Sequence, residues 1–307
     1  MIRFYEKRKI FFTISGLIFL IGIIAMFFNG VQLDIQFRGG AILKYQYTGT
    51  IDSEAAGNFV AEKLNRLVQT QTTEDLATKK TYVVFNLAGE YGLDGVEQQA
   101  LDSALKAQFP DSNLVSSESS MVEPFFGRRF LQNGMIAIAL SAILIVLYVW
   151  VRFRRIHGLS AGVMALVALF HDLLVVFFVC VLFKIPIGDS FVAVALTVLG
   201  YSINDTIVIY DRIRENSKLH AGMQVEELVN KSITQSMTRS INTNLAVFAS
   251  VTLVYVFAFA GRIESIMSFA LPMAIGSISG CYSTICIAGP LWTMWQKHKE
   301  KKGLQAA

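Results

Sequence analysis

The chain has 307 residues, of which 53% are hydrophobic and 16% are charged, and its formal net charge is +4. Soluble globular proteins carry about a quarter charged residues, so this composition argues against a soluble protein. The basic residues gather beside apolar segments, which indicates membrane topology and gives no support for nucleic-acid binding.

Six apolar segments reach the length of about 20 residues that a helix needs to cross a bilayer. They comprise residues 9–28, 133–151, 159–183, 191–210, 241–260 and 266–295. The last segment is long, and Pro272 near its start predicts a kink or a loop. The first is too long for the apolar part of a signal peptide and lacks a small-residue cleavage site, so we predict an uncleaved anchor.

Basic clusters precede the first predicted span and follow the second, the fourth and the sixth. The short loops on the other side contain only Lys184 and Arg262. Because cytoplasmic loops carry the excess of Lys and Arg, we expect residues 1–28 to start in the cytoplasm and residues 297–307 to form a basic cytoplasmic tail.

The one large polar segment, residues 29–131, is therefore expected outside the membrane. Alternation of polar and apolar residues predicts strands at 41–49, 81–89 and 114–122, and helical spacing predicts helices at 52–69 and 94–109. This order predicts a small α+β domain of the ferredoxin-like type, with its helices on one face of the sheet.

Residues 132–296 are expected to form the remaining five-helix membrane region, with a cytoplasmic loop at 211–240. In that loop Val225, Leu228, Val229 and Ile233 share one helical face. This pattern predicts an amphipathic helix along the membrane or a packed linker. The GxxxG spacings at 158–162 and 276–280 indicate close helix packing.

Asp205 lies inside the fourth predicted span, six residues before the charges resume at Asp211. Helical rise puts its carboxyl group about 9 Å inside the apolar segment. A charged side chain there is costly and is retained mainly where it faces a partner or a water-filled cavity. We expect Asp205 to gain and lose protons, and the alternative is a structural hydrogen bond from a neutral carboxyl group.

Arg239 stands before the fifth predicted span, on the same side of the membrane, and is the expected counter-charge of Asp205. The alternative for Arg239 is an ordinary basic flank. The surrounding residues that could order water are Ser202, Asn204, Thr206, Ser236, Thr238, Asn242, Thr243 and Asn244.

His171 and Asp172 form a second polar pair in the third predicted span. A histidine beside a carboxylate can relay protons near neutral pH. Neighbouring helical residues point about 100° apart, so the two side chains need not touch. A hydrogen bond between helices is the structural alternative, and the ligands that a metal phosphohydrolase would also need are absent.

The sequence lacks the nucleophile elbow, the zinc-protease motif and the phosphate-binding loop of nucleotide enzymes. The cysteines Cys180, Cys281 and Cys286 lie in predicted spans without metal-ligand spacing. We therefore expect no enzyme, no metal and no cofactor, and any work must draw on an ion gradient or a partner.

Several segments resemble the SecF family, the smaller subunit of the bacterial SecD–SecF protein-export complex. They are GYSINDTIVIYDRIREN at 200–216, ALFHDL at 168–173, SITQSMTRSINTN at 232–244 and FRGG at 37–40. The resemblance covers nearly the whole chain. It implies one half of a resistance-nodulation-division transporter in the bacterial inner membrane, completed by a SecD-like subunit.

The resemblance further implies that Asp205 and Arg239 belong to a proton pathway, with H⁺ as the coupling ion and Na⁺ not excluded. Proton flow would move the outer domain, which would act on preproteins leaving the SecYEG channel. Two rival functions stay open at this point: a proton-driven small-molecule or lipid exporter subunit, and a passive scaffold of the translocase.

Overall fold

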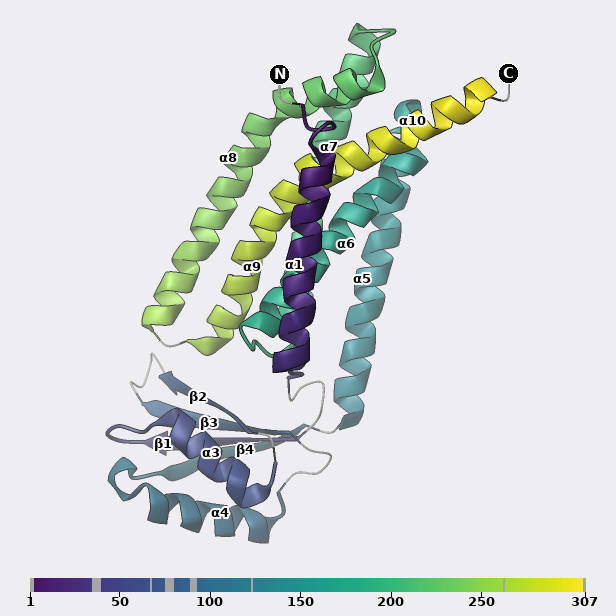
Figure 1. Cartoon of the computed structure of the whole chain (residues 1–307). Helices are drawn as coiled ribbons and strands as arrows, with labels where there is room; N and C mark the ends of the chain where they lie inside the picture. The colour runs from purple at the N-terminus through teal and green to yellow at the C-terminus, as the bar shows by residue number, and fades with distance from the viewer. Residues whose placement is uncertain are drawn as a thin grey trace.

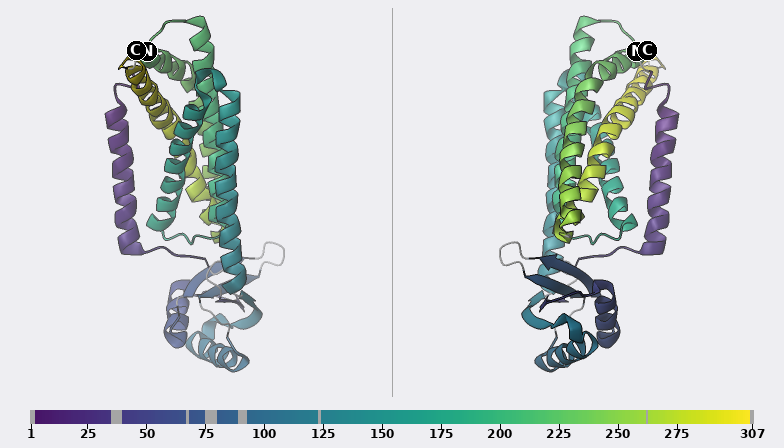
Figure 2. Two further views of the ribbon diagram at one scale, coloured as in Figure 1. Left: turned by 90° about the vertical axis from the view of Figure 1, so that its right-hand side faces the viewer. Right: turned by 90° about the vertical axis from the view of Figure 1, so that its left-hand side faces the viewer.

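The computed structural model describes residues 3–34, 40–66, 68–74, 80–88, 93–122, 124–261 and 263–305. Arg262 and residues 37–39 of the FRGG segment lie outside the described residues. A bundle of long helices carries a small domain at one end (Figure 1). Both chain ends lie at the opposite end, which we call the terminal end of the bundle (Figure 2).

Six helical stretches of the described chain are long and apolar enough to cross a membrane, which confirms the number of predicted spans. The bundle helices are α1 (Arg8–Asn29), α5 (Pro124–Arg152), α6 (Gly158–Leu182), α7 (Asp189–Leu219), α8 (Val225–Ala260) and α9 (Glu264–Ser283). A π-helical turn, Thr284–Ala288, leads from α9 into α10 (Gly289–Gln305).

The sixth span bends at the π-helical turn. Pro272 lies inside α9 without interrupting it. In Figure 1, α10 runs at an angle to α9 toward the end of the chain. Sharp bends of this kind occur where a π-bulge breaks the regular hydrogen-bond ladder.

The segment 211–240 is helical except for residues 220–224, because α7 and α8 both extend beyond the apolar stretches. Leu228, Val229 and Ile233 of α8 are buried and pack in one core cluster with Tyr210 and Ile213 of α7. The apolar face that the sequence predicts for this part of α8 is therefore buried in the bundle, as expected for a packed linker.

Glycines of both GxxxG spacings lie at close contacts between helices, as the spacing predicts. A Cβ atom at Gly276 would lie 2.7 Å from Val198 on α7 and 2.9 Å from Val176 on α6. One at Gly162 would lie 3.2 Å from the carbonyl oxygen of Val146 on α5. Only glycine lets these helices approach so closely.

The described residues of the outer domain form four strands, one more than the sequence predicts. In chain order it contains β1 (Gly40–Tyr47), α3 (Ser53–Leu64), β2 (Val68–Glu74), β3 (Thr81–Ala88), α4 (Gly95–Gln108) and β4 (Val115–Val122). The antiparallel order β2-β3-β1-β4 is that of a ferredoxin-like split βαβ sheet. Both helices cover the face that points away from the bundle (Figure 1).

The helix predicted at 52–69 includes the first two residues of the missed strand β2, and the rest of the strand has no predicted structure. The helix in fact ends at Leu64, where Asn65 takes the left-handed conformation at φ 50°. Such a residue commonly terminates a helix. The strand sequence, VQTQTTE, is polar and gave no apolar alternation.

The core of the outer domain is tied together by Tyr45 of β1. Its ring packs edge-on against Phe85 at a centroid distance of 5.8 Å, and its hydroxyl donates a hydrogen bond to Asp102 of α4. Burial, with a further contribution from Asp102, raises the pKa of Tyr45 above its ordinary value of 10.0.

The outer domain is joined to the bundle through a short pairing. Leu33 and Ile187 form an isolated parallel bridge between the linker after α1 and the loop between α6 and α7. The Ile187 amide donates to the Gln32 carbonyl at 2.8 Å, and the Asp34 amide donates to the Ile187 carbonyl at 3.0 Å. The linker is thereby attached directly ahead of α7.

Candidate functional site in the helix bundle

Asp205 is buried between α7 and α8, with 4% of its surface exposed. Its carboxylate accepts a hydrogen bond from the Asn244 side-chain amide on α8. The same amide also donates to the Ser240 carbonyl at 2.9 Å, which fixes its orientation. The direct partner of Asp205 is thus an amide, where the sequence analysis expected a guanidinium group.

Arg239 lies on α8 with an exposed side chain, five residues before Asn244. It is near enough to Asp205 for an electrostatic interaction. Among the ion pairs between described residues, none within 4.0 Å joins the two. The structure therefore brings Arg239 into the neighbourhood of Asp205 without direct contact.

A polar cavity of about 650 Å³ lies between α7 and α8 toward the terminal end of the bundle. Asn204, Ser236 and Arg239 line it, and Asp211 and Lys218 line it nearer the chain ends. Asn204, the residue before Asp205 on α7, lines this cavity, and Asp205 is not among the described lining residues. Water in such a cavity is what a buried carboxyl group needs to exchange a proton.

Asp172 on α6 is fully buried and accepts hydrogen bonds from three serine hydroxyls. The donors are Ser202 of α7 at 2.7 Å, Ser279 of α9 at 2.6 Å and Ser283 of α9 at 2.7 Å. These hydrogen bonds tie α6, α7 and α9 together at Asp172.

His171 does touch Asp172, because its Nδ1 atom lies 3.2 Å from the carboxylate. Its ring packs between Phe19 of α1 and Tyr282 of α9, at centroid distances of 5.1 Å and 5.8 Å. The buried Nε2 atom has no hydrogen-bond partner among the described residues. The pair thus connects the first span to the buried serine cluster.

Further polar contacts continue from Ser202 to Thr206 through the Ser202 backbone carbonyl. The Thr206 hydroxyl donates to the Ser202 carbonyl at 3.1 Å and lies 3.0 Å from the Thr284 hydroxyl. Close approach is possible because a Cβ atom at Gly280 would lie only 3.2 Å from the Ser202 Cβ. Polar contacts therefore run from Asp172 to the residue next to Asp205.

The remaining predicted site residues lie apart from these contacts. Asn242 and Thr243 are exposed on α8, and Asn204 is exposed while lining the polar cavity. The sequence analysis missed Ser279 and Ser283 as partners of Asp172. Their spacing of four residues puts them on one helical face, which is a signal that the sequence did contain.

No group of three or more metal-ligating side chains occurs within the described ranges. The three cysteines are free thiols in the bundle helices. The polar groups gathered in the bundle are thus carboxyl, amide, hydroxyl and imidazole side chains.

Six apolar spans with buried carboxylates, joined to one ferredoxin-like outer domain, define a polytopic membrane transport protein. A family model described as the C-terminal part of the protein export membrane proteins SecD and SecF matches residues 101–298. The chain belongs to the SecF family of protein translocase subunits, which assist Sec-dependent export and have no catalytic activity.

Two curated relatives show how far the similarity extends. Protein translocase subunit SecF of Petrotoga mobilis is 32% identical over 308 residues, with 98% of each chain covered. Protein translocase subunit SecDF of Bacillus subtilis is 31% identical over 305 residues, covering 97% of this chain and 39% of that one. This SecD–SecF fusion implies association of the present chain with a SecD subunit.

The fold is that of solved SecDF structures. SecDF from Thermus thermophilus, described as a translocon-associated membrane protein, superposes with a TM-score of 0.77 at 26% identity. The match covers 96% of this chain and 39% of that one. A SecDF structure in a super-membrane-facing form gives a TM-score of 0.72 and covers 40% of that chain.

Proposed function

We propose that this SecF-family subunit uses the proton gradient to assist export, through protonation and deprotonation of Asp205. The observation that carries the proposal is a buried carboxylate with one side-chain donor, Asn244, beside a polar cavity containing Arg239. H⁺ is the proposed coupling ion, and Na⁺ is the alternative to be tested.

The contrast between the two buried carboxylates supports this assignment. Protonation of Asp172 would disturb three serine donors on two neighbouring helices. Protonation of Asp205 would disturb one amide donor and the nearby charge of Arg239. Asp205 can therefore change its charge with a small rearrangement. Asp172 instead holds neighbouring helices together through its three hydrogen bonds.

The attachment of α7 to the outer domain offers a route for coupling. The helix that carries Asp205 begins at Asp189, directly after the loop that pairs with the linker through Leu33 and Ile187. A shift of α7 on protonation would therefore move the linker and the domain beyond it. In our proposal this movement acts on preproteins leaving the SecYEG channel.

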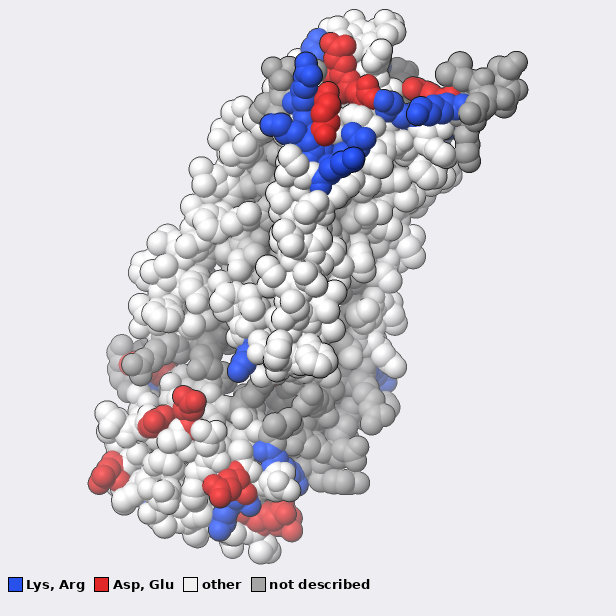
Figure 3. Space-filling model, viewed as in Figure 1, with Lys and Arg blue, Asp and Glu red and all other residues white. Residues whose placement is uncertain are grey.

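Charge distribution supports an orientation with both chain ends in the cytoplasm of a bacterium and the outer domain in the periplasm. Charged side chains gather at the terminal end and on the outer domain, with a nearly uncharged belt between them (Figure 3). The terminal end carries the basic clusters around residues 7–9, 212–218 and 297–301. Cytoplasmic sides of membrane proteins carry such an excess.

Proton flux tests the assignment directly. The chain and a SecD subunit would be reconstituted with SecYEG in vesicles that contain a pH-sensitive dye, and a preprotein would be added. We expect preprotein-dependent acid movement that Asp205→Asn abolishes and that a sodium gradient does not replace. Equal flux in the variant would show that the protons do not pass through Asp205.

A further inference from the structure

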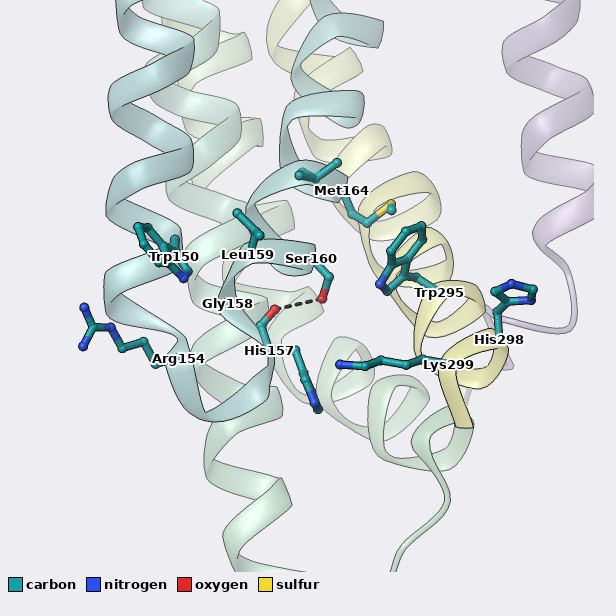
Figure 4. Close-up of a pocket in the computed structure, with 11 residues that line it drawn as sticks. Trp150, Arg154, His157, Gly158, Leu159, Ser160, Met164, Trp295, His298 and Lys299 are labelled. Carbon is teal, nitrogen blue, oxygen red and sulfur yellow. Dashed lines mark hydrogen bonds between the residues drawn. The ribbon is translucent and has the colours of Figure 1, made fainter. Parts of the chain in front are cut away.

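A second large cavity, of about 820 Å³, opens at the terminal end of the bundle between α5, α6 and α10. Trp150 and Trp295 lie on opposite sides of it, with Leu159 and Met164 between them (Figure 4). Trp150 and Trp295 are 43% and 51% exposed. The cavity shares no lining residue with the polar cavity at Arg239.

Four basic or titratable nitrogen-containing side chains lie at this cavity: Arg154, His157, His298 and Lys299. Among the described residues that line it, none is a carboxylate. Figure 4 shows the Lys299 side chain extending toward His157, across the opening. The rim is therefore positively charged and the walls are apolar.

The cations of this rim differ from their neighbours in having no acidic partner. Arg152 pairs with Asp211, and Lys297 pairs with Glu226. Within the part of the chain that the structure describes, no ion pair includes Arg154 or Lys299. The Arg154 guanidinium instead lies 6.0 Å from the centre of the Trp150 ring.

The cavity lies at the terminal ends of two candidate spans, Leu131–Arg152 and Gly158–Leu182. Tryptophan is enriched at the level of the lipid headgroups. Basic pockets between spanning helices bind anionic headgroups, while apolar walls accept acyl chains. We propose that this cavity is a binding site for an anionic glycerophospholipid of the leaflet at the terminal end. Arg154 and Lys299 hold its phosphate, and an acyl chain lies between Trp150 and Trp295.

The site does not depend on the proposed proton pathway, so the two can fail separately. Its test uses the full chain in phosphatidylcholine vesicles, titrated with phosphatidylglycerol whose acyl chains are brominated. Bromine quenches nearby tryptophan fluorescence. Of the three tryptophans, Trp292 is buried, so Trp150 and Trp295 report on the cavity. Brominated phosphatidylcholine measures quenching by bulk lipid.

We expect brominated phosphatidylglycerol to quench saturably at a low mole fraction, and brominated phosphatidylcholine only in proportion to its amount. The double variant Arg154→Gln/Lys299→Gln should weaken the saturable phase by about 25-fold, because each cation near the surface contributes about fivefold. The charge-preserving Arg154→Lys/Lys299→Arg should keep it.

The matched control is Lys7→Gln/Lys9→Gln, which removes two exposed cations at the same end of the bundle and outside the cavity. It should leave the saturable phase unchanged. Equal quenching by the two lipids, or an equal effect of both charge-removing variants, would overturn the proposal. Loss of the saturable quenching when a SecD subunit is bound would also overturn the proposal, because the subunit would then occupy the cavity in place of a lipid.

Discussion

Asn244 of α8 donates a hydrogen bond to the carboxylate of Asp205 on α7, across a contact between two spanning helices. Among the candidate spans of the described chain, the apolar 18-residue window of α8 has the smallest buried share, 6%. The residue that holds Asp205 thus belongs to a helix whose apolar part is largely uncovered in this chain alone. We infer that the SecD subunit packs against α8 and responds there to the charge of Asp205.

The first prediction concerns this hydrogen bond. Asn244→Ala removes the direct donor to Asp205, so we expect a severalfold loss of gradient-dependent preprotein export at normal abundance. Asn242→Ala is the control, because Asn242 is exposed on the same helix. Export into inverted vesicles measures both. Equal export rates for the two variants would show that Asn244 is not needed to position Asp205.

The second prediction concerns the stability of the bundle around Asp172. Asp172→Ala leaves the Ser202, Ser279 and Ser283 hydroxyls buried without their acceptor. We expect a loss of about 3 kcal/mol or more, since each unsatisfied buried group costs about 1–3 kcal/mol. Thermal unfolding in detergent would measure it. A melting temperature equal to that of the unmodified chain would refute the structural role.

The third prediction concerns Tyr45 in the outer domain, whose folded pKa lies above its ordinary value of 10.0. Its contribution to stability is therefore complete below pH 10 and is lost as pH rises further. Tyr45→Phe should cost about 1 kcal/mol at neutral pH through the lost hydrogen bond to Asp102. It should also reduce the loss of stability above pH 10. Parallel pH curves for the two proteins would contradict this.

The fourth prediction concerns the connection between the outer domain and α7. A Cβ atom at Gly188 would lie 2.9 Å from the Asp34 Cβ, so Gly188→Val should separate the linker from the start of α7. Export should fall while proton movement persists. Gly200→Ala is the control, because no described atom outside its own stretch of helix lies within 4 Å of the added Cβ. Normal export in Gly188→Val would rule out this route of coupling.

Much of the fold followed from the sequence because its patterns are local. Apolar length predicted the six spans, and alternation of polar and apolar residues predicted three of the four outer strands. β2 was missed because its polar residues give no apolar alternation. Its place in the sheet depends on pairing with β3. A local sequence pattern does not encode this pairing between separate segments.

The candidate site was predictable only in part. Asp205 and Asp172 stood out because charged residues are rare in spans. Their partners depend on how the helices rotate against each other. Asn244 could not be chosen from its polar neighbours on α8, and the contacts of Ser279 and Ser283 follow from the close packing of α9 on α6 and α7. Sequence spacing alone does not determine such rotations.

The most direct test of the proton-driven function is the effect of Asp205→Asn on preprotein translocation into inverted vesicles, with and without an uncoupler. Asparagine keeps the shape and the hydrogen-bonding capacity of the side chain but cannot be charged. At normal abundance, we predict slow export that the uncoupler does not reduce further. Export as fast as in the unmodified protein, with equal sensitivity to the uncoupler, would contradict the account and leave Asp205 as a structural hydrogen bonder.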